Sequence, residues 1–316
     1  MKRRIICLFL SLVFALSCLS SCSDAPSEPD INSEISVVAT IFPQYDFARA
    51  VSGELANVKM LIKPAAEIHS FDPTPSDIIE IQNSDLFIYI GGEGDAWVDS
   101  ILDSIDTDEI KILRLMDFVS PIEEEAVNSS SGEHDHNEAE IEFDEHIWTA
   151  PSNAIKMTEA IADALCEIDP QNSDAYKANC ETYTSEIQGV ADEIQEVVDS
   201  AKHKMLLVAD RFPFIYFTKE FGLDYMAAFN GCSTETEVSA AVLAELIDYL
   251  EDNGLSAVYH VELSNENIAT AVSEQTGAEK LLLHSCHNIS SDDFNAGVTY
   301  VDLMRQNAAN LRKGLN

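Results

Sequence analysis

This chain is organised around one stretch, Pro64-Ala-Ala-Glu-Ile-His-Ser-Phe-Asp-Pro-Thr-Pro-Ser-Asp77. It follows an apolar run, 58–62, that is typical of a buried strand. A helix is predicted to begin within it, because Thr74 suits the N-cap and Pro75 the first helical position. His69 therefore lies on a loop at the carboxyl end of a strand, where open α/β sheets bind their ligands. Its imidazole is a candidate metal ligand; the alternative is a loop histidine that makes only local hydrogen bonds.

The first residues predict export and lipidation. A short basic segment precedes an apolar run, 5–16, which is too short to span a bilayer comfortably. The stretch Leu19-Ser-Ser-Cys22 resembles a bacterial lipobox, which predicts a lipoprotein signal peptide over 1–21 and lipidation of Cys22. The alternative is an ordinary secretory signal that is cleaved nearby. The polar residues 22–34 predict a flexible tether.

The charge of the chain excludes one class of partner. The formal net charge is −38 at pH 7, and removal of residues 1–21 takes away three positive charges and no acids, which lowers it to −41. Nucleic-acid binding is therefore not expected, because binding to phosphates requires an excess of Lys and Arg. The charge is compatible with a cation as ligand, although an acidic surface is most often simply solvated.

Strands and helices alternate along residues 35–168 and again along 204–316. This alternation predicts an α/β fold with two lobes, each a mostly parallel sheet flanked by helices. In 172–201, apolar residues recur at three- and four-residue steps, which predicts one helix of roughly 45 Å. That helix would fill the segment 169–203 and join the two lobes. A last helix is expected over about 297–315.

An acidic segment, 120–143, interrupts the first lobe. It is low in complexity and lacks apolar periodicity. Its two histidines, His134 and His136, are candidates for weak accessory capture of a metal ion; the alternative is a disordered acidic loop. His146 follows directly, again just before a predicted helix, and Trp148 is expected to bury its surroundings. The first lobe thus offers two loop histidines in equivalent positions.

In the second lobe, polar residues follow the predicted strands: Asp210, Arg211, the 232–237 loop, Glu262 and 284–287. Imidazoles and carboxylates that meet from two facing sheets would form a site with nitrogen and oxygen ligands, which suits Zn(II) or Mn(II).

Two cysteines also lie just beyond predicted strands of this lobe. Cys232 and Cys286 are expected either to form a disulfide or to remain free thiols. For Cys286 and His287, a disulfide and a structural histidine are expected rather than metal ligation.

Across nearly all of the mature chain, the sequence resembles the solute-binding lipoproteins of bacterial zinc and manganese ABC importers (the cluster A-I, or zinc-uptake, family). Residues 64–77 are similar to the first-ligand motif of that family, with His69 at the ligand position. The stretch Asp144-Glu-His-Ile-Trp-Thr-Ala-Pro151 is similar to the second motif, which assigns His146 as a ligand. The histidine-containing acidic loop before this motif and the long connecting helix also match.

Two positions depart from the family pattern. The third ligand position, usually His or Glu, matches Arg211, which cannot bind a cation; its neighbour Asp210 is expected to supply the oxygen instead. The fourth, usually Asp, matches His284. The other candidate ligands are Glu235, Glu237, Glu262 and His260. Arg211 has a second possible role, an ion pair with one of these acids across the cleft. Trp148 and Phe71 are expected to wall that cleft, with ordinary core packing as the alternative.

The resemblance implies a function in metal transport. The protein would capture zinc, or manganese in the alternative, and deliver it to an ABC permease with its ATPase. A monomer is implied, lipid-anchored to the outer face of the cell membrane or periplasmic. An enzyme is not expected, because the chain has no His-Glu-x-x-His helix, Gly-x-Ser-x-Gly elbow or phosphate loop. The remaining alternatives are a zinc-dependent hydrolase and a surface protein that acts in cell adhesion.

Overall fold

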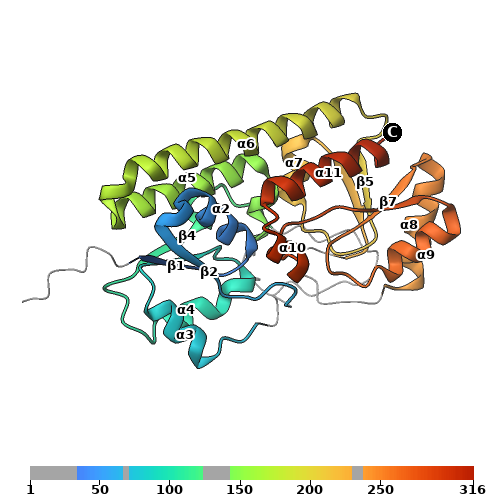
Figure 1. The fold of residues 1–316 in the computed structure, drawn as a ribbon. Helices are drawn as coiled ribbons and strands as arrows, with labels where there is room; N and C mark the ends of the chain where they lie inside the picture. Colours follow the sequence, from blue (N-terminus) through green and yellow to red (C-terminus); the bar gives the residue numbers. More distant parts are fainter. Residues whose placement is uncertain (1–33, 67–70, 124–142, 230–237) are drawn as a thin grey trace, which may run out of the picture. The chain divides into compact units, whose positions relative to one another are not determined.

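Two parallel sheets of four strands form the framework of the protein (Figure 1). The computed structural model describes residues 34–66, 71–123, 143–229 and 238–316. The first sheet has the order β2-β1-β3-β4, with β1 at Ile35–Ala39, β2 at Ala56–Met60, β3 at Leu86–Tyr89 and β4 at Lys111–Arg114. The second has the order β6-β5-β7-β8, with β5 at Met205–Val208, β6 at Asp224–Ala227, β7 at Ala257–His260 and β8 at Glu279–Leu282. The predicted two-lobe α/β fold is confirmed.

Helices flank both sheets and connect them. The first lobe contains four helices among the described residues: α2 (Phe42–Ser52), α3 (Pro75–Gln82), α4 (Ala96–Leu102) and α5 (Pro151–Ile168). After the long helix α6 (Ser173–Ser200), the second lobe contains α7 (Ile215–Phe221), α8 (Ala240–Asn253), α9 (Asn267–Thr276), α10 (Ser291–Ala296) and α11 (Tyr300–Gly314). Short 3₁₀ turns are η1 (Gly53–Leu55), η2 (Glu93–Asp95), η3 (Leu115–Phe118), η4 (Ile147–Thr149) and η5 (Pro170–Asn172).

The helix starts follow the local capping chemistry. Thr74 and Asp77 form a reciprocal capping box with Pro75 in the first turn, so α3 begins where the sequence predicts. The last helix differs from its prediction. Thr299 caps α11 through Asp302, whereas Gly297 has a φ of 74° and ends the separate short helix α10. The expected start near residue 297 was therefore wrong, because a left-handed glycine stops one helix there and a threonine cap starts the next.

The long helix α6 confirms the periodicity of its sequence. Its buried positions include Ile187, Val190, Ile194 and Val197, which recur at three- and four-residue steps along one face. This face packs against α2 and α5 of the first lobe and against α7 and α11 of the second. The long helix therefore joins the two lobes by packing against helices of each.

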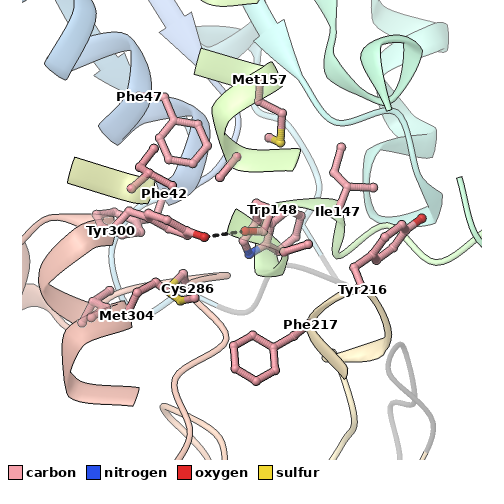
Figure 2. Close-up of a cluster of buried hydrophobic side chains, with 14 of the residues drawn as sticks. Phe42, Phe47, Ile147, Trp148, Met157, Tyr216, Phe217, Cys286, Tyr300 and Met304 are labelled. Atoms are coloured by element: carbon pink, nitrogen blue, oxygen red, sulfur yellow. Dashed lines mark hydrogen bonds between the residues drawn. The ribbon is translucent and has the colours of Figure 1, made fainter. Parts of the chain in front are cut away.

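One hydrophobic cluster runs from the first lobe into the second, and Trp148 lies within it (Figure 2). Trp148 is fully buried, together with Phe42 and Phe47 from α2. The second lobe contributes Tyr300 and Phe217 to the same cluster. Shared burial of this kind is the main stabilising contribution between packed elements, at about 25 cal/mol for each Å² of apolar surface removed from water.

The two sheets and their helices form one compact unit from Ile35 to Asn316. Within the described residues, none of the helices combines the length and the apolar character that a membrane span requires. The lobe boundaries predicted at 168/169 and 203/204, the signal peptide and the tether are not tested and remain predictions.

Candidate metal centre

His146 lies at the start of η4, in the turn that leads into α5. Its backbone N–H donates to Asp144 Oδ1 at 2.8 Å, and its Nδ1 lies 3.2 Å from the same oxygen. The residue is almost fully buried. Thr149 closes the turn, since its hydroxyl donates to the His146 carbonyl oxygen at 2.8 Å. When Nδ1–H donates to a carboxylate, the lone pair of Nε2 remains for a metal ion, as is usual for histidine ligands.

Glu145 is the residue before this histidine and is also buried. Its Oε2 accepts a hydrogen bond of 2.6 Å from the backbone N–H of Gly94 in η2. The loop after β3 thereby orients the carboxylate. The same loop contains Asp95, whose Oδ2 accepts from Ile90 N–H at 2.7 Å and from Gly91 N–H at 3.1 Å. Burial raises the pKa of Asp95 from 3.8 to about 6, and the negative charge of Glu145 acts in the same direction.

His287 approaches from the second lobe, on the loop after β8. Its ring is perpendicular to that of His146, at 89°, with the ring centroids 5.1 Å apart. The indole of Trp148 lies against both imidazoles, with centroid distances of 5.4 Å to His146 and 5.0 Å to His287. One apolar ring thus excludes water from one side of both histidines.

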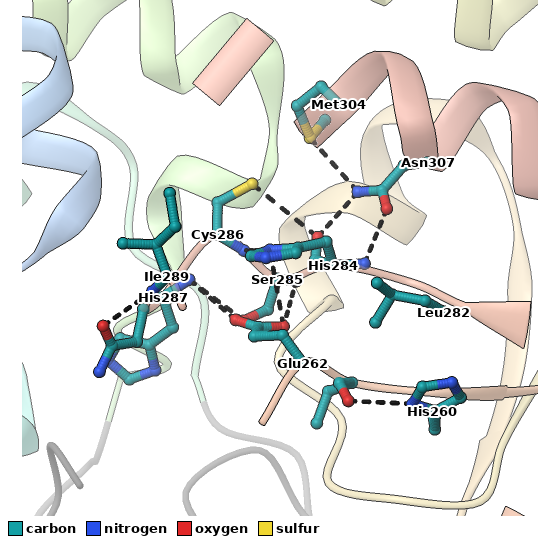
Figure 3. Close-up of polar contacts among 12 residues, drawn as sticks. His260, Glu262, Leu282, His284, Ser285, Cys286, His287, Ile289, Met304 and Asn307 are labelled. Atoms are coloured by element: carbon teal, nitrogen blue, oxygen red, sulfur yellow. Dashed lines mark hydrogen bonds and ion pairs between the residues drawn. The ribbon is translucent and has the colours of Figure 1, made fainter. Parts of the chain in front are cut away.

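Glu262, just beyond β7, supports the His287 loop from below (Figure 3). Its Oε1 accepts from Ser285 Oγ at 2.5 Å and from His287 N–H at 3.2 Å, while Oε2 accepts from Ser285 N–H at 2.8 Å. Burial would raise the pKa of Glu262, but the neighbouring imidazole of His284 and the hydrogen bonds from Ser285 outweigh it, so the pKa is lowered. The loop therefore rests on an ionised carboxylate.

Three side chains come together as a possible metal site: Glu145, His146 and His287. One ligand atom from each lies within 4.8 Å of the others. Two imidazole nitrogens and a carboxylate oxygen are ligands that Zn(II) accepts, and Mn(II) also accepts such a set. Two of these residues belong to the first lobe and one to the second, so an ion bound here would connect the lobes.

The segment that leads to His69 is attached to the same loop of the second lobe. Ala65 N–H donates to Ile289 O at 2.9 Å, and Asn288 Nδ2 donates to Ala66 O at 2.6 Å. Asn288 is the neighbour of His287, so residue 66 is bonded to the loop that contributes His287 to the candidate group. His69 itself lies outside the described residues.

Other candidate ligands have different surroundings. His284 is not part of the group of three: its Nδ1 accepts from Cys286 N–H at 2.9 Å, and its backbone is held by Asn307. Asp210 is buried, and its Oδ1 accepts from the Arg211 backbone N–H at 2.9 Å. Neither residue joins a cluster of possible metal ligands among the described residues.

The expected cleft residues also have defined positions. Trp148 packs against the two histidines of the group, as described above. Phe71 packs edge-on against Trp97 in the small apolar cluster of the first lobe, with 5.3 Å between the ring centroids. Arg211 is half-buried and makes no ion pair among the described residues, and the oxygens of Glu262 accept from Ser285 and His287 instead.

Cys286 and its neighbourhood decide which histidine faces the first lobe. Cys286 is a buried free thiol with a φ of 60°, and burial raises its pKa well above the usual range. This left-handed residue between His284 and His287 turns the chain sharply. The remaining candidates, Glu235, Glu237, Cys232, His134, His136 and Cys22, lie outside the described residues.

The sequence does not single out two members of the group. His287 is expected from the sequence to be a structural histidine rather than a metal ligand. Glu145 adjoins His146, but no pattern in the sequence around it indicates a ligand. The conformations that bring these side chains together depend on contacts between distant segments, so neither residue has a local signal of its own.

Comparison with known proteins gives a consistent result. A family model described as zinc-uptake complex component A, periplasmic, matches residues 37–314. The zinc-binding lipoprotein AdcA of Streptococcus pneumoniae serotype 4 is 29% identical over 309 residues, which cover 96% of this chain and 60% of that protein. The chain thus spans less than two thirds of that relative. The high-affinity zinc uptake system protein ZnuA of Bacillus subtilis is 29% identical over 307 residues, with 96% and 94% covered.

Among solved structures, the Zn(II)-bound ZnuA-like domain of Streptococcus pneumoniae AdcA superimposes with a TM-score of 0.74 at 27% identity. The match covers 90% of this chain and 99% of that domain. The family model and the solved structure thus both match this chain over most of its length, and the two-lobe fold of the chain is the fold of that structure. The chain therefore belongs to the family of periplasmic A components of zinc-uptake complexes.

Proposed function

We propose that this protein captures a divalent transition metal, zinc in the first place, between its two lobes and delivers it to an ABC permease. One observation carries the proposal: Glu145, His146 and His287 offer ligand atoms within 4.8 Å of one another. The family and the zinc-binding names of its relatives support zinc as the metal. Manganese is the alternative metal, because a carboxylate in the ligand set makes the site compatible with it.

His69 is the proposed fourth ligand. The resemblance of its motif supports this assignment, and so does the attachment of Ala66 to Asn288. Residue 69 is three positions beyond Ala66, and three residues span at most about 10 Å. The bond from Asn288 thus holds the segment that leads to His69 beside the loop that contains His287. Three nitrogens and one oxygen would complete the tetrahedral set that zinc prefers.

The permease would recognise the loaded protein through the relation between the lobes. The first lobe would supply His69, Glu145 and His146, and the second would close the site with His287. Loss of the ion would remove the link between His287 and the first lobe, while the contacts around Trp148 remain. The relatives named as lipoproteins support attachment through Cys22 to the outer face of the cell membrane. We expect the protein to act there as a monomer.

Metal binding by untagged, metal-stripped protein tests the function. Calorimetry with zinc and manganese at neutral pH is expected to give one high-affinity site, with His146→Ala and His287→Ala each weakening it at least 100-fold. His260→Ala is the control, because His260 lies in the second lobe outside the group. Wild-type protein that binds neither metal would overturn the proposal. His284→Ala tests the fourth ligand position of the family pattern, which matches His284, and this variant is expected to retain one bound ion.

A further inference from the structure

Two glycines of the loop after β3 lie directly against Glu145. A Cβ atom added to Gly92 would be 2.3 Å from Glu145 Cβ and 2.7 Å from Oε2. A Cβ atom added to Gly94 would be 2.9 Å from Oε1 and 3.0 Å from Oε2. Distances under about 3 Å do not occur between such atoms, so any side chain at either position would displace the carboxylate.

The backbone at these positions does not itself require glycine. Gly92 has a φ of −93°, which any residue adopts, and Gly94 is not among the residues with positive φ. Gly91, the neighbouring glycine, is different, because its φ is 96°. At Gly92 and Gly94, glycine is therefore needed because it has no side chain, and not because of its backbone conformation. The carboxylate of Glu145 occupies the room that a side chain would take.

The same loop also orients the carboxylate. Gly94 N–H donates to Oε2 at 2.6 Å, so the backbone of the loop fixes the direction in which the carboxylate points. Glu145 is 4% exposed and adjoins the buried imidazole of His146. Burying a carboxylate costs free energy unless hydrogen bonds or a positive charge compensate for it. A divalent cation between Glu145, His146 and His287 would provide that charge.

We propose that Glu145 is a metal ligand and that Gly92 and Gly94 form the pocket that admits and orients its carboxylate. The inference rests on the metal-capture function proposed above and deepens it. It assigns the anionic ligand to the first lobe, next to His146, whereas the two ligand positions of the family that fall in the second lobe match Arg211 and His284, neither of which is a carboxylate. The first lobe would then bind the ion through the negative carboxylate of Glu145 and a nitrogen of His146. Among the described residues, the second lobe would contribute His287.

A matched set of variants tests this assignment. Glu145→Gln keeps the shape and removes the charge, and Glu93→Gln makes the same change at an exposed position of the same loop. Zinc affinity, measured by competition with a chelator, is expected to fall about 100-fold or more in Glu145→Gln and less than twofold in Glu93→Gln. Manganese affinity should fall more steeply, since manganese depends more on oxygen ligands. The visible spectrum of bound Co(II) should change in Glu145→Gln only.

Gly94→Ala tests the pocket without removing the carboxylate. It is expected to lower zinc affinity at least 10-fold in protein that retains Glu145, because the new methyl group displaces the ligand. In the Glu145→Gln background the same change should add little, since the two substitutions act on one interaction. Thermal unfolding of the metal-free variants separates this effect from a loss of folding. Glu145→Asp, which keeps the charge on a side chain shorter by one methylene, is expected to bind with intermediate affinity.

The outcomes distinguish this inference from the proposed function. Wild-type zinc affinity and an unchanged Co(II) spectrum in Glu145→Gln would overturn the inference, and the proposed function would stand if His146→Ala still lost the metal. Additive effects of Gly94→Ala and Glu145→Gln would overturn the role of the pocket. Failure of the wild-type protein to bind either metal would overturn both.

Discussion

The indole Nε1 of Trp148 donates a hydrogen bond of 2.8 Å to the carbonyl oxygen of Ser285. This bond joins the residue two positions after His146 to the residue two positions before His287. It therefore sets the distance between the two loops that bear the candidate ligands. Tyr300 completes the connection, because its hydroxyl donates to the Trp148 carbonyl oxygen at 2.8 Å.

Trp148→Phe should destabilise the protein by about 2–3 kcal/mol, since it leaves a small cavity and an unpaired Ser285 carbonyl group. Urea unfolding of the metal-free protein measures this. Trp97→Phe is the matched control, because Trp97 Nε1 has no hydrogen-bond partner among the described residues, and it should cost about 1 kcal/mol or less. Equal losses in the two variants would show that the bond to Ser285 contributes nothing.

A second pair of variants compares two buried tyrosines. The Tyr259 hydroxyl is buried without a hydrogen-bond partner in the described part of the chain, whereas the Tyr300 hydroxyl donates to Trp148. Tyr259→Phe is expected to be neutral or to stabilise the protein by up to about 1 kcal/mol, because an unpartnered buried hydroxyl is costly. Tyr300→Phe should destabilise it by about 1–3 kcal/mol. Differential scanning calorimetry of both variants checks the order, and a greater loss in Tyr259→Phe would contradict the explanation.

Glu262→Gln should weaken zinc binding about 10- to 100-fold, although Glu262 is not itself in the candidate group. The carboxylate accepts from the backbone of Ser285 and His287, and an amide nitrogen in its place would repel one of these donors. Chelator competition gives the affinity, with Glu279→Gln as an exposed control from β8. If Glu262→Gln retained wild-type affinity, the orientation of His287 would not depend on this carboxylate.

The pH dependence of stability should carry the signature of Asp95. The pKa of this buried carboxyl group is raised to about 6, so the folded state binds its proton more tightly than the unfolded state does. Its contribution favours folding at low pH and is lost as the pH rises from about 4 to about 6.

Asp95→Asn cannot ionise and keeps an acceptor for the N–H groups of Ile90 and Gly91. Between pH 4 and pH 6 the wild type should lose up to about 3 kcal/mol of unfolding free energy through Asp95, because one pKa unit corresponds to about 1.4 kcal/mol. The Asp95→Asn variant should not show this loss. Urea unfolding of metal-free protein across the window measures the difference. Asp99→Asn, an exposed change nearby, should leave the wild-type dependence intact. Coincident curves for Asp95→Asn and the wild type would refute the assignment.

Local chemistry made much of the fold predictable. The capping box of Thr74 and Asp77 lies within four residues, and the apolar face of α6 repeats within each turn, so both can be recognised from neighbouring residues alone. Alternating strands and helices likewise predicted two parallel sheets. The position of His146 before a helix was also predicted, because the signals that start α5 lie beside it in the sequence.

The composition of the candidate metal-binding group depended on distant contacts. Which of His284 and His287 faces His146 is decided by the left-handed Cys286, by Glu262 and by the hydrogen bond from Trp148. The place of Glu145 depends on space left by Gly94, 51 residues earlier in the chain. By itself, the sequence determined the elements, their order and the family, because these follow from short-range pattern. Only the tertiary structure decided which side chains meet, because that depends on loop conformations held by residues far apart in the chain.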